Sequence, residues 1–248
     1  MSENEYAEGF YKNLWEYQHW SGPSPNDDEN TRAASIKVLI EKYVLPNREA
    51  SGPLRILDIG CGRGWLTKIL SSYGLAIGVD PLEAGVKKAA SLFPDLEFRK
   101  GTCADILTAE GPGSFDLIVA SEVIEHVEND LKKDFLMSFF TLLKHGGFAI
   151  LTTPRGDLWN KWKRLEIPEQ PVEQWITERE LRKLCLDIGF SIPVQQRAFL
   201  HQFHYDWLTG LTIRRPLRVL LGKYPDSVFL KPLKWRCAFY QVILLQRP

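Results

Sequence analysis

The stretch Leu54-Arg-Ile-Leu-Asp-Ile-Gly-Cys-Gly-Arg-Gly-Trp-Leu-Thr67 decides how the chain is organised. Its apolar run at residues 56–59 is typical of a buried strand, and a helical pattern follows a few residues later. Between the two, Gly60, Gly62 and Gly64 permit a sharp turn whose backbone N–H groups a ligand can approach closely. The stretch therefore predicts a strand, turn and helix of an α/β fold that binds a ligand on its main chain.

A second apolar stretch, about twenty residues further on, ends in an acid. Residues 76–79 read Ala-Ile-Gly-Val, and Asp80 follows them. A carboxylate at this point can accept hydrogen bonds from both hydroxyls of a ribose. The glycine spacing is G-x-G-x-G with Asp58 before it, and not the G-x-G-x-x-G of dinucleotide-binding proteins. The glycine turn and the acid together predict a nucleoside ligand.

Four segments, in order, resemble the motifs of the class I S-adenosylmethionine (SAM)-dependent methyltransferases. Residues 58–64 resemble motif I, and residues 78–81 resemble the second motif. Residues 115–127, Phe-Asp-Leu-Ile-Val-Ala-Ser-Glu-Val-Ile-Glu-His-Val, resemble the fourth motif, and residues 142–154 are similar to the fifth-strand signature. The resemblance covers residues 30–200, and the motif pattern is most similar to that of the O-methyltransferases of quinone biosynthesis.

This resemblance implies SAM as the cofactor and S-adenosylhomocysteine as the product. Asp105 stands where related enzymes bind the adenine amino group and its neighbour Ile106 covers the ring, although Asp105 also suits the cap of a turn. Arg32 stands near the sequence position at which similar enzymes have an arginine that reaches the methionine carboxylate. It equally suits an exposed helix start. The implied cofactor-binding residues are Arg32, Asp58, Gly60, Cys61, Gly62, Gly64, Asp80, Pro81, Leu82, Asp105, Ile106, Ser121 and Glu122.

Glu122, Glu125 and His126 follow the fourth expected strand and are the candidates for chemistry. Spacings of three and four residues place them on one face of a helix, at the carboxyl edge of the sheet. Because the sulfonium of SAM is already activated, the enzyme has to position the acceptor and remove the proton of an acceptor hydroxyl.

Three roles for this cluster are open. His126 can act as a general base, or Glu122 and His126 can orient the loop by hydrogen bonds. The cluster can also hold a divalent metal, as E-x-x-E-H does in small-RNA 2′-O-methyltransferases and as has been proposed for quinone-ring O-methyltransferases. The RNA enzymes add a histidine just before a W-x-T helix start, and residues 170–177 of this chain, Gln-Pro-Val-Glu-Gln-Trp-Ile-Thr, lack it. We therefore favour the base without metal.

The composition is that of a globular enzyme and argues against some partners. A length of 248 residues is enough for one large α/β domain. Lys and Arg number 31, as do Asp and Glu, so no overall field favours nucleic acid. Cys61, Cys103, Cys185 and Cys237 form no C-x-x-C pair, which favours reduced cysteines. The polar start and the lack of a long apolar run predict a cytoplasmic protein with no signal peptide and no transmembrane segment.

The alternation of apolar strand patterns and helical patterns predicts βαβ units and a parallel sheet. We expect the Rossmann-like, seven-stranded sheet of a class I methyltransferase, with helices on both faces and an antiparallel last strand. The strands are expected near 54–59, 75–79, 96–99, 115–120, 147–153, 190–199 and 238–245. The helices are expected near 33–44, 65–73, 83–92, 130–144 and 177–188, the last with Thr177 as N-cap, Glu180 in a capping box, and an end at Gly189.

The whole chain is expected to form a single methyltransferase domain, from residue 1 to 248, of four parts. These are lid helices at 1–50, a SAM-binding core at 51–199, a substrate cap at 200–236 and the final strand at 237–248.

Two of these parts allow a second interpretation. The aromatic face of residues 3–20 fits a lid over the site, and it also fits a helix that only docks on the domain. The basic, leucine-containing stretch at 213–222 fits a folded cap with a solvated face, and it also fits a peripheral membrane contact.

The sequence predicts methyl transfer from SAM to a hydroxyl of a small molecule, such as a phenol, quinone precursor, sugar or natural product. The connection at 154–176, with Trp159 and Trp162, lies where open α/β sheets place binding residues. An RNA 2′-O-methyltransferase is the alternative enzyme. A SAM-binding partner subunit without transfer activity is a further alternative, against which the ribose acid and the E-x-x-E-H cluster argue.

Overall fold

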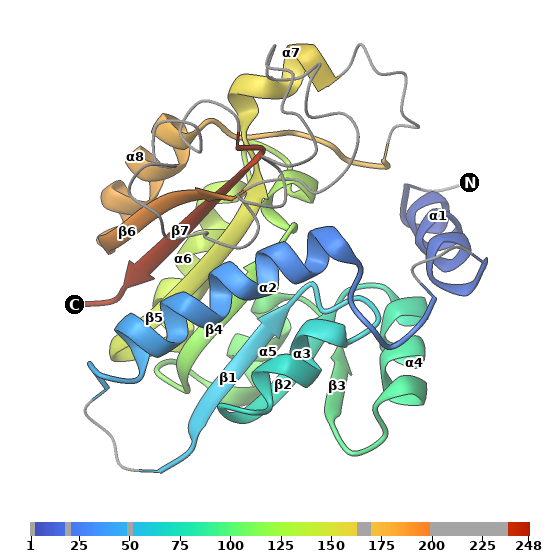
Figure 1. The fold of residues 1–248 in the computed structure, drawn as a ribbon, viewed down its shortest axis with the longest axis horizontal. Coiled ribbons are helices and arrows are strands. Elements are labelled where there is room, and N and C mark those ends of the chain that lie inside the picture. Colours follow the sequence, from blue (N-terminus) through green and yellow to red (C-terminus); the bar gives the residue numbers. More distant parts are fainter. Residues whose placement is uncertain (1–2, 18–20, 49–51, 163–169, 199–237) are drawn as a thin grey trace, which may run out of the picture.

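The computed structural model describes residues 3–17, 21–48, 52–162, 170–198 and 238–248 (Figure 1). Its centre is a seven-stranded sheet in the order β3-β2-β1-β4-β5-β7-β6. The strands are β1 (Leu54–Ile59), β2 (Gly74–Asp80), β3 (Glu97–Lys100), β4 (Phe115–Ser121), β5 (Leu143–Pro154), β6 (Ser191–Ala198) and β7 (Tyr240–Gln246).

The pairing of the strands follows the expected topology. β3, β2, β1, β4 and β5 are parallel, and β7 runs antiparallel to both β5 and β6. β1 and β4 lie side by side in the middle of the sheet, so their carboxyl ends meet at one edge. In an open α/β sheet this edge is where ligands bind. The expected seven-stranded fold with an antiparallel last strand is therefore confirmed.

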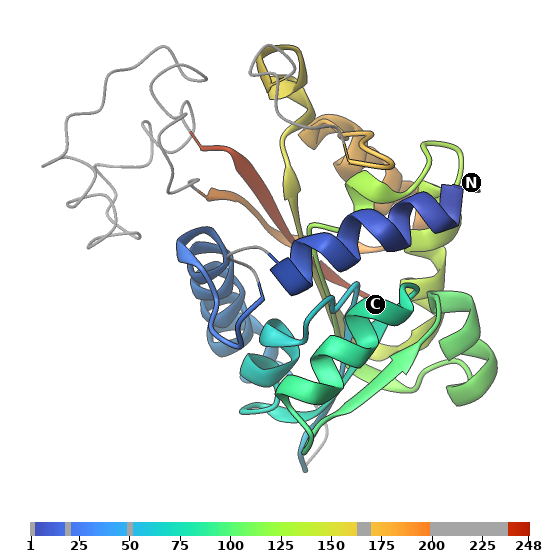
Figure 2. The ribbon, with the colours of Figure 1, turned by 90° about the vertical axis from the view of Figure 1, so that its right-hand side faces the viewer.

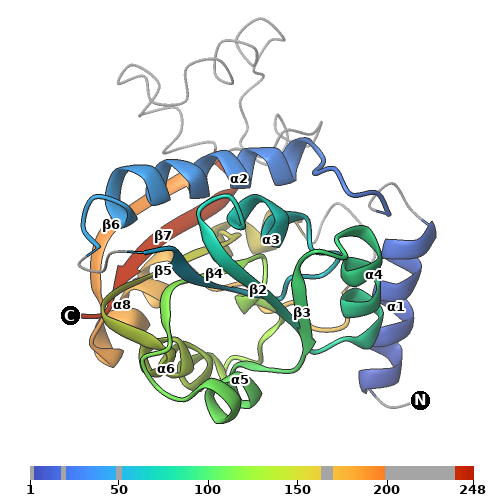
Figure 3. The ribbon, with the colours of Figure 1, turned by 90° about the horizontal axis from the view of Figure 1, so that it is seen from below.

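Helices cover both faces of the sheet (Figure 3). One face packs against α2 (Asp27–Leu39), the π-helical turn η1 (Ile40–Val44) and α3 (Trp65–Leu70). The other face packs against α5 (Cys103–Glu110), α6 (Lys132–Leu142) and α8 (Glu178–Ile188). α4 (Glu83–Leu92) lies beside β3, and α1 (Glu3–Tyr17) lies across α4 (Figure 2). Three short turns complete the described elements: η2 (Ile124–His126), η3 (Gly156–Leu158) and α7 (Trp159–Trp162).

Capping residues fix where these helices begin. The side chain of Thr177 accepts a hydrogen bond from the backbone amide of Glu180, and the side chain of Glu180 accepts one from the amide of Thr177. The expected capping box therefore starts α8, and the helix ends at Gly189 as expected. α2 starts earlier than the expected residue 33, because Asn26 and Glu29 form a capping box of the same kind. The helix α5 was not expected at all, since its short apolar pattern reads as a loop.

The described helices and the segment at 200–236 bear on the expected membrane contacts. Within the described ranges no helix has the length and apolar character needed to cross a membrane. The expected substrate cap at 200–236, with its basic stretch, lies outside the described residues, and no support for a peripheral membrane contact comes from the described ones.

Candidate active site

The glycine turn brings the end of β1 onto the end of β2. Gly60, Gly62 and Gly64 all have left-handed backbone conformations, with φ of 69°, 50° and 83°, which side chains disfavour. The amide of Gly60 donates to the carbonyl of Val79 at 2.8 Å. The amide of Gly62 donates to Oδ2 of Asp80 at 2.9 Å. The turn and the acid that the sequence singled out therefore form one site.

Asp80 is held by the backbone on both sides of its carboxylate. Oδ1 accepts from the amide of Leu82 at 2.9 Å, while Oδ2 accepts from Gly62. Burial raises the pKa of Asp80 to about 6, against the effect of these two hydrogen bonds. Each carboxylate oxygen keeps a second lone pair for a ligand. Contact of Asp80, Pro81 and Leu82 with the cofactor stays a prediction.

Asp58 and Cys61 lie deeper than the rest of the turn. The carboxylate of Asp58 accepts from the hydroxyl of Thr67 at 2.6 Å, which ties β1 to the first helix turn after the glycines. Burial raises the pKa of Asp58 to about 7 and raises the pKa of the Cys61 thiol as well. Both residues thus belong to the buried part of the turn. Their contact with the cofactor stays a prediction.

Asp105 caps a helix that the sequence did not predict. Its carboxylate accepts from the amide and the hydroxyl of Thr102, at 2.7 and 2.8 Å, in a capping box at the start of α5. These hydrogen bonds lower the pKa of Asp105. Ile106 packs in the core. The capping interpretation of Asp105 therefore matches the structure, and the adenine role of the two residues stays a prediction.

The residues after β4 rest on the end of β5. Glu122 has a φ of 59°, the one positive value outside glycine among the described residues. Thr152 donates its hydroxyl to Oε1 of Glu122 at 3.0 Å and lies 2.9 Å from the hydroxyl of Ser121. The next threonine, Thr153, donates to Oε2 of Glu125 at 2.8 Å. Sequence reasoning missed these threonines, although their place at the end of the fifth-strand signature was a signal.

The expected single helical face of Glu122, Glu125 and His126 is wrong. η2 spans only Ile124–His126, and the left-handed residue Glu122 stands before it. A 3₁₀ turn of three residues cannot align side chains as an α-helix does.

The two carboxylates, that of buried Glu125 and that of half-buried Glu122, interact with each other. Burial raises the pKa of both Glu122 and Glu125, and the charge of Glu125 raises that of Glu122 further.

One ring nitrogen of His126 is bound to the backbone of the segment at 170–176. Its Nδ1 lies 2.6 Å from the carbonyl oxygen of Val172. A carbonyl only accepts, so Nδ1 carries the proton and Nε2 keeps its lone pair. Burial lowers the pKa of His126, which favours this neutral form. The ring of Tyr11 stands edge-on, with its centroid 6.2 Å from that of the imidazole.

The cluster does not fit a metal ion. Among the residues that the structure describes, no three His, Cys, Asp or Glu side chains converge on a point where a cation could sit. Each acid of the E-x-x-E-H cluster instead binds a threonine hydroxyl, and the imidazole binds a backbone carbonyl. The geometry thus disagrees with a three-residue metal centre.

Arg32 lies inside the site and not at an exposed helix start. One guanidinium nitrogen donates to the hydroxyl of Tyr240 at 3.0 Å, and the guanidinium lies 5.1 Å from the centre of the Tyr240 ring. Its Nε is buried, and within the described part of the chain it has no hydrogen-bond partner. The charge of Glu122 also acts on Arg32. Sequence reasoning missed Tyr240, which the final strand carries to this edge.

α1 lies over the glycine turn. The carboxylate of Glu8 accepts from the amide of Glu83 at 2.8 Å, in the first turn of α4. The indole of Trp15 is so close that a Cβ at Gly62 would lie 3.3 Å from it. The hydroxyl of Tyr11 donates to Oε1 of Gln170 at 3.1 Å. α1 therefore touches the glycine turn on one side and the segment at 170–176 on the other.

A buried ion pair ties the turn to the first turn of α2. Arg63 donates two hydrogen bonds to the carboxylate of Glu29, at 2.6 and 2.7 Å, and both side chains are buried. Arg63 also donates to the carbonyls of Gly22 and Ser24. The chain between α1 and α2 is thereby fixed to the fourth residue of the G-x-G-x-G turn.

Aromatic rings form a wall beyond β5. Trp159 and Trp175 lie 5.1 Å apart between ring centroids, and Trp175 and Phe239 lie 5.4 Å apart. The wall continues to Tyr240, beside Arg32. The side chain of Trp162 lies outside the described residues.

Comparison with known proteins decides the family. The sequence pattern of a family described as a methyltransferase domain matches residues 29–195. The chain belongs to this family. The expected resemblance to class I SAM-dependent methyltransferases is therefore confirmed, and SAM is its cofactor.

Individual relatives agree with this assignment. The ubiquinone biosynthesis O-methyltransferase of Caulobacter vibrioides is 39% identical over 105 residues, covering 40% of this chain and 40% of the relative. That of Bradyrhizobium diazoefficiens is 31% identical over 173 residues, covering 63% and 66%. The chain thus matches well under two thirds of the length of several such relatives. The magnesium protoporphyrin IX methyltransferase of Synechocystis has the same fold, with a TM-score of 0.62, 17% identity and 99% and 98% coverage.

Proposed function

We propose that this chain transfers the methyl group of SAM to a hydroxyl of a small molecule, with His126 as the general base. One observation carries the proposal: Nδ1 of His126 is bound to the carbonyl of Val172, which leaves Nε2 as an acceptor. The relatives that are named ubiquinone biosynthesis O-methyltransferase support a small-molecule hydroxyl as the acceptor.

The cofactor is bound, in this proposal, across the carboxyl ends of β1, β2 and β4. Asp80 takes the ribose hydroxyls, and the glycine turn lets the ligand lie on the main chain. The unpartnered Nε of Arg32 suits the methionine carboxylate, because a buried guanidinium N–H without an acceptor is costly. Adenine lies beside Asp105 and Ile106, as the resemblance implies.

The chemical step needs little beyond positioning and one proton transfer. SAM supplies a methyl group on a sulfonium, which leaves as the neutral thioether. The acceptor hydroxyl gives its proton to Nε2 of His126 as its oxygen forms the bond to the methyl carbon. Glu122 in its ionised form favours the imidazolium that results, because the negative charge raises the pKa of His126. The imidazolium then loses the proton to solvent.

α1 and the aromatic wall shape the acceptor side in this proposal. Tyr11 lies between His126 and Gln170, and Trp15 covers the glycine turn. Rings at these positions exclude water from the methyl group and suit a planar acceptor.

The test is transfer of the methyl group from isotopically labelled SAM to a panel of catechols, polyprenylated phenols and a short RNA. We expect O-methylated phenol, identified by mass spectrometry. His126→Gln should lower kcat by about 10²–10⁴-fold with unchanged SAM affinity by calorimetry, as loss of a general base does. Exposed His145, near the opposite end of β5, gives the matched control His145→Gln, which should retain activity.

The pH profile adds a second check. Because burial lowers the pKa of His126, kcat should rise with pH through a value below about 6.5, the ordinary imidazole pKa. Methylation at nitrogen or carbon, methylation of the RNA alone, or full activity of His126→Gln would each overturn the proposal.

A further inference from the structure

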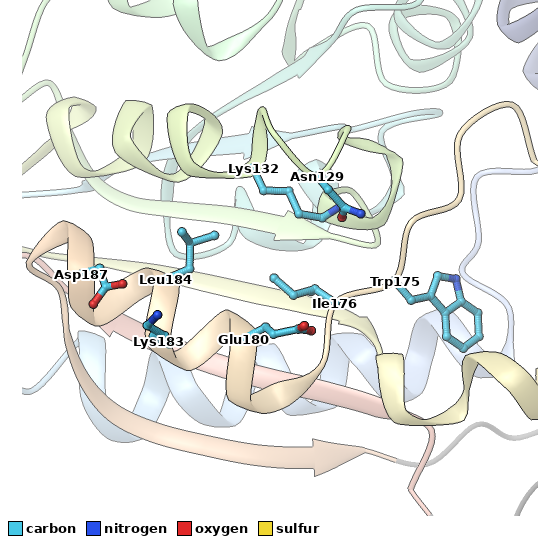
Figure 4. A pocket seen from close by; sticks show the side chains of 8 residues that line it. All are labelled: Asn129, Lys132, Trp175, Ile176, Glu180, Lys183, Leu184 and Asp187. Atoms are coloured by element: carbon cyan, nitrogen blue, oxygen red, sulfur yellow. The ribbon is translucent and has the colours of Figure 1, made fainter.

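Lys132, the first residue of α6, is buried although it carries an ammonium group. Only 2% of the residue is exposed. Figure 4 shows its side chain beside that of Asn129, on one side of a cavity of about 450 Å³ whose other side carries Glu180 on α8. No sequence motif singles out this lysine.

This position is unfavourable for a positive charge in two ways. The first turn of a helix carries the positive end of the helix dipole, which repels a cation. Burial removes the ammonium from water, and this desolvation lowers the pKa of Lys132. A methionine of similar length would avoid both penalties. The helix start itself therefore does not explain why a lysine stands here. The hydrogen bonds of its ammonium group do explain it.

The ammonium contacts the residue that follows His126. Nζ donates to the carbonyl of Val127 at 2.6 Å and to Oδ1 of Asn129 at 2.8 Å. Val127 is the residue that follows His126 and ends η2. The ammonium thus fixes the peptide group between Val127 and Glu128, one residue beyond the histidine, to the first turn of α6.

The segment at 170–176 holds the same turn from the opposite side. The amide of Gln174 donates to the carbonyl of Glu125 at 2.7 Å, and the carbonyl of Val172 accepts from the His126 ring. The side chain of Gln174 also accepts from the amide of Asn129 at 2.9 Å. The turn that carries the imidazole is therefore held at two places, by the segment at 170–176 and by Lys132.

We propose that Lys132 is a positioning residue for His126: its ammonium holds the Val127 peptide so that Nε2 points to the acceptor. This proposal rests on the base role of His126 proposed above. Lys132 touches neither substrate nor cofactor in this proposal, and it acts only through the turn.

The charges around the imidazole give this role a distinctive signature. Glu122 and Glu173 raise the pKa of His126, and the ammonium of Lys132 lowers it in the same direction as burial. The ring of Tyr11 faces the imidazole without a charge. Removing the ammonium should therefore favour the imidazolium and raise the pKa of His126. A loss of fold alone would not move this pKa in the folded fraction.

The experiment compares Lys132→Met, Lys132→Arg and the control Lys133→Met in the full chain. Lys133 is the exposed neighbour in the same helix turn, so its variant removes the same charge without the two hydrogen bonds. The pKa of His126 is read from the ¹³Cε1 resonance of histidine-labelled protein with S-adenosylhomocysteine, assigned by His126→Gln. kcat, KM, SAM affinity and thermal unfolding are measured alongside.

We expect Lys132→Met to raise the pKa of His126 and to lower kcat about 10- to 100-fold, the scale of a misplaced catalytic group, with SAM affinity kept. Lys132→Arg should restore most of kcat, and Lys133→Met should change nothing. Should Lys132→Met fail to fold, Lys132→Gln, which removes the charge and keeps a hydrogen-bond donor, should raise the same pKa.

An unchanged His126 pKa in Lys132→Met, or a loss of kcat that Lys132→Arg does not restore, overturns the proposal. The resonance reports on Lys132 even if the base role fails, because it needs no methyl acceptor. Full activity of His126→Gln would instead reject the proposed function, so the two failures are distinguishable.

Discussion

Replacing Asp80 by Asn tests the cofactor site with little change of shape. The carboxylate of Asp80 accepts the amides of Gly62 and Leu82 and, in our proposal, also the two ribose hydroxyls. The amide side chain of Asn has one oxygen, so the variant loses the acceptor lone pairs of the other oxygen and the negative charge. One hydrogen bond to a charged group that is lost from a buried site costs about 2–3 kcal/mol, which is about 30- to 150-fold in affinity.

Titration calorimetry with SAM and with S-adenosylhomocysteine measures this loss. The pH dependence provides a second readout, because burial raises the pKa of Asp80 to about 6. The ionised form accepts the ribose hydroxyls, so SAM should bind more tightly as pH rises from 5 to 7. In Asp80→Asn this rise should be absent. Exposed Asp95 provides the control variant Asp95→Asn, for which both affinity and pH dependence should match the parent protein.

Two results would refute this reasoning. One is an affinity of Asp80→Asn within threefold of the parent protein, with an unchanged thermal midpoint. The other is a SAM affinity that weakens between pH 5 and 7, since this would mean that the protonated carboxyl is the binding form.

Further predictions concern the turn, the aromatic wall and the metal. Gly62→Val should abolish SAM binding in calorimetry, because its Cβ would meet Trp15 in a left-handed backbone conformation; normal binding would contradict this. Trp159→Ala should raise the KM for the acceptor severalfold and keep the SAM affinity, and a loss of folding would make Trp159 a core residue. Chelator should leave activity intact, because Glu125 is already bound by Thr153; inhibition reversed by added Mg²⁺ would show that a metal takes part.

Most of the fold could be predicted because its signals are local. The apolar run before the glycines gave β1, and the capping box at Thr177 gave the start of α8 to within one residue. α5 could not be predicted in this way, because its eight residues carry no clear apolar period and its cap was interpreted as a ligand contact. The switch to a π-helical turn at Ile40–Val44 depends on packing and has no signature in the sequence.

The site was predictable where one motif carries it and not where distant segments meet. Gly62 and Asp80 are eighteen residues apart, and their hydrogen bond follows from the parallel pairing of β1 and β2. The partner of His126 is the carbonyl of Val172, and a backbone atom leaves no trace in residue identity. Tyr240 meets Arg32 because β7, the last strand of the chain, lies beside β5 in the sheet.

The contacts of α1 imply an order for the catalytic cycle. Tyr11 and Trp15 are one helical turn apart, and they stack on each other. One touches His126 and Gln170, while the other covers Gly62. A rigid helix cannot uncover one of these places and keep the other covered. With the cofactor and acceptor bound as we propose, we expect exchange of the nucleoside and exchange of the acceptor to be coupled events. Steady-state kinetics should then be sequential, with S-adenosylhomocysteine and the methylated product released in the same opening, and the rate of that opening should limit turnover when the acceptor is saturating.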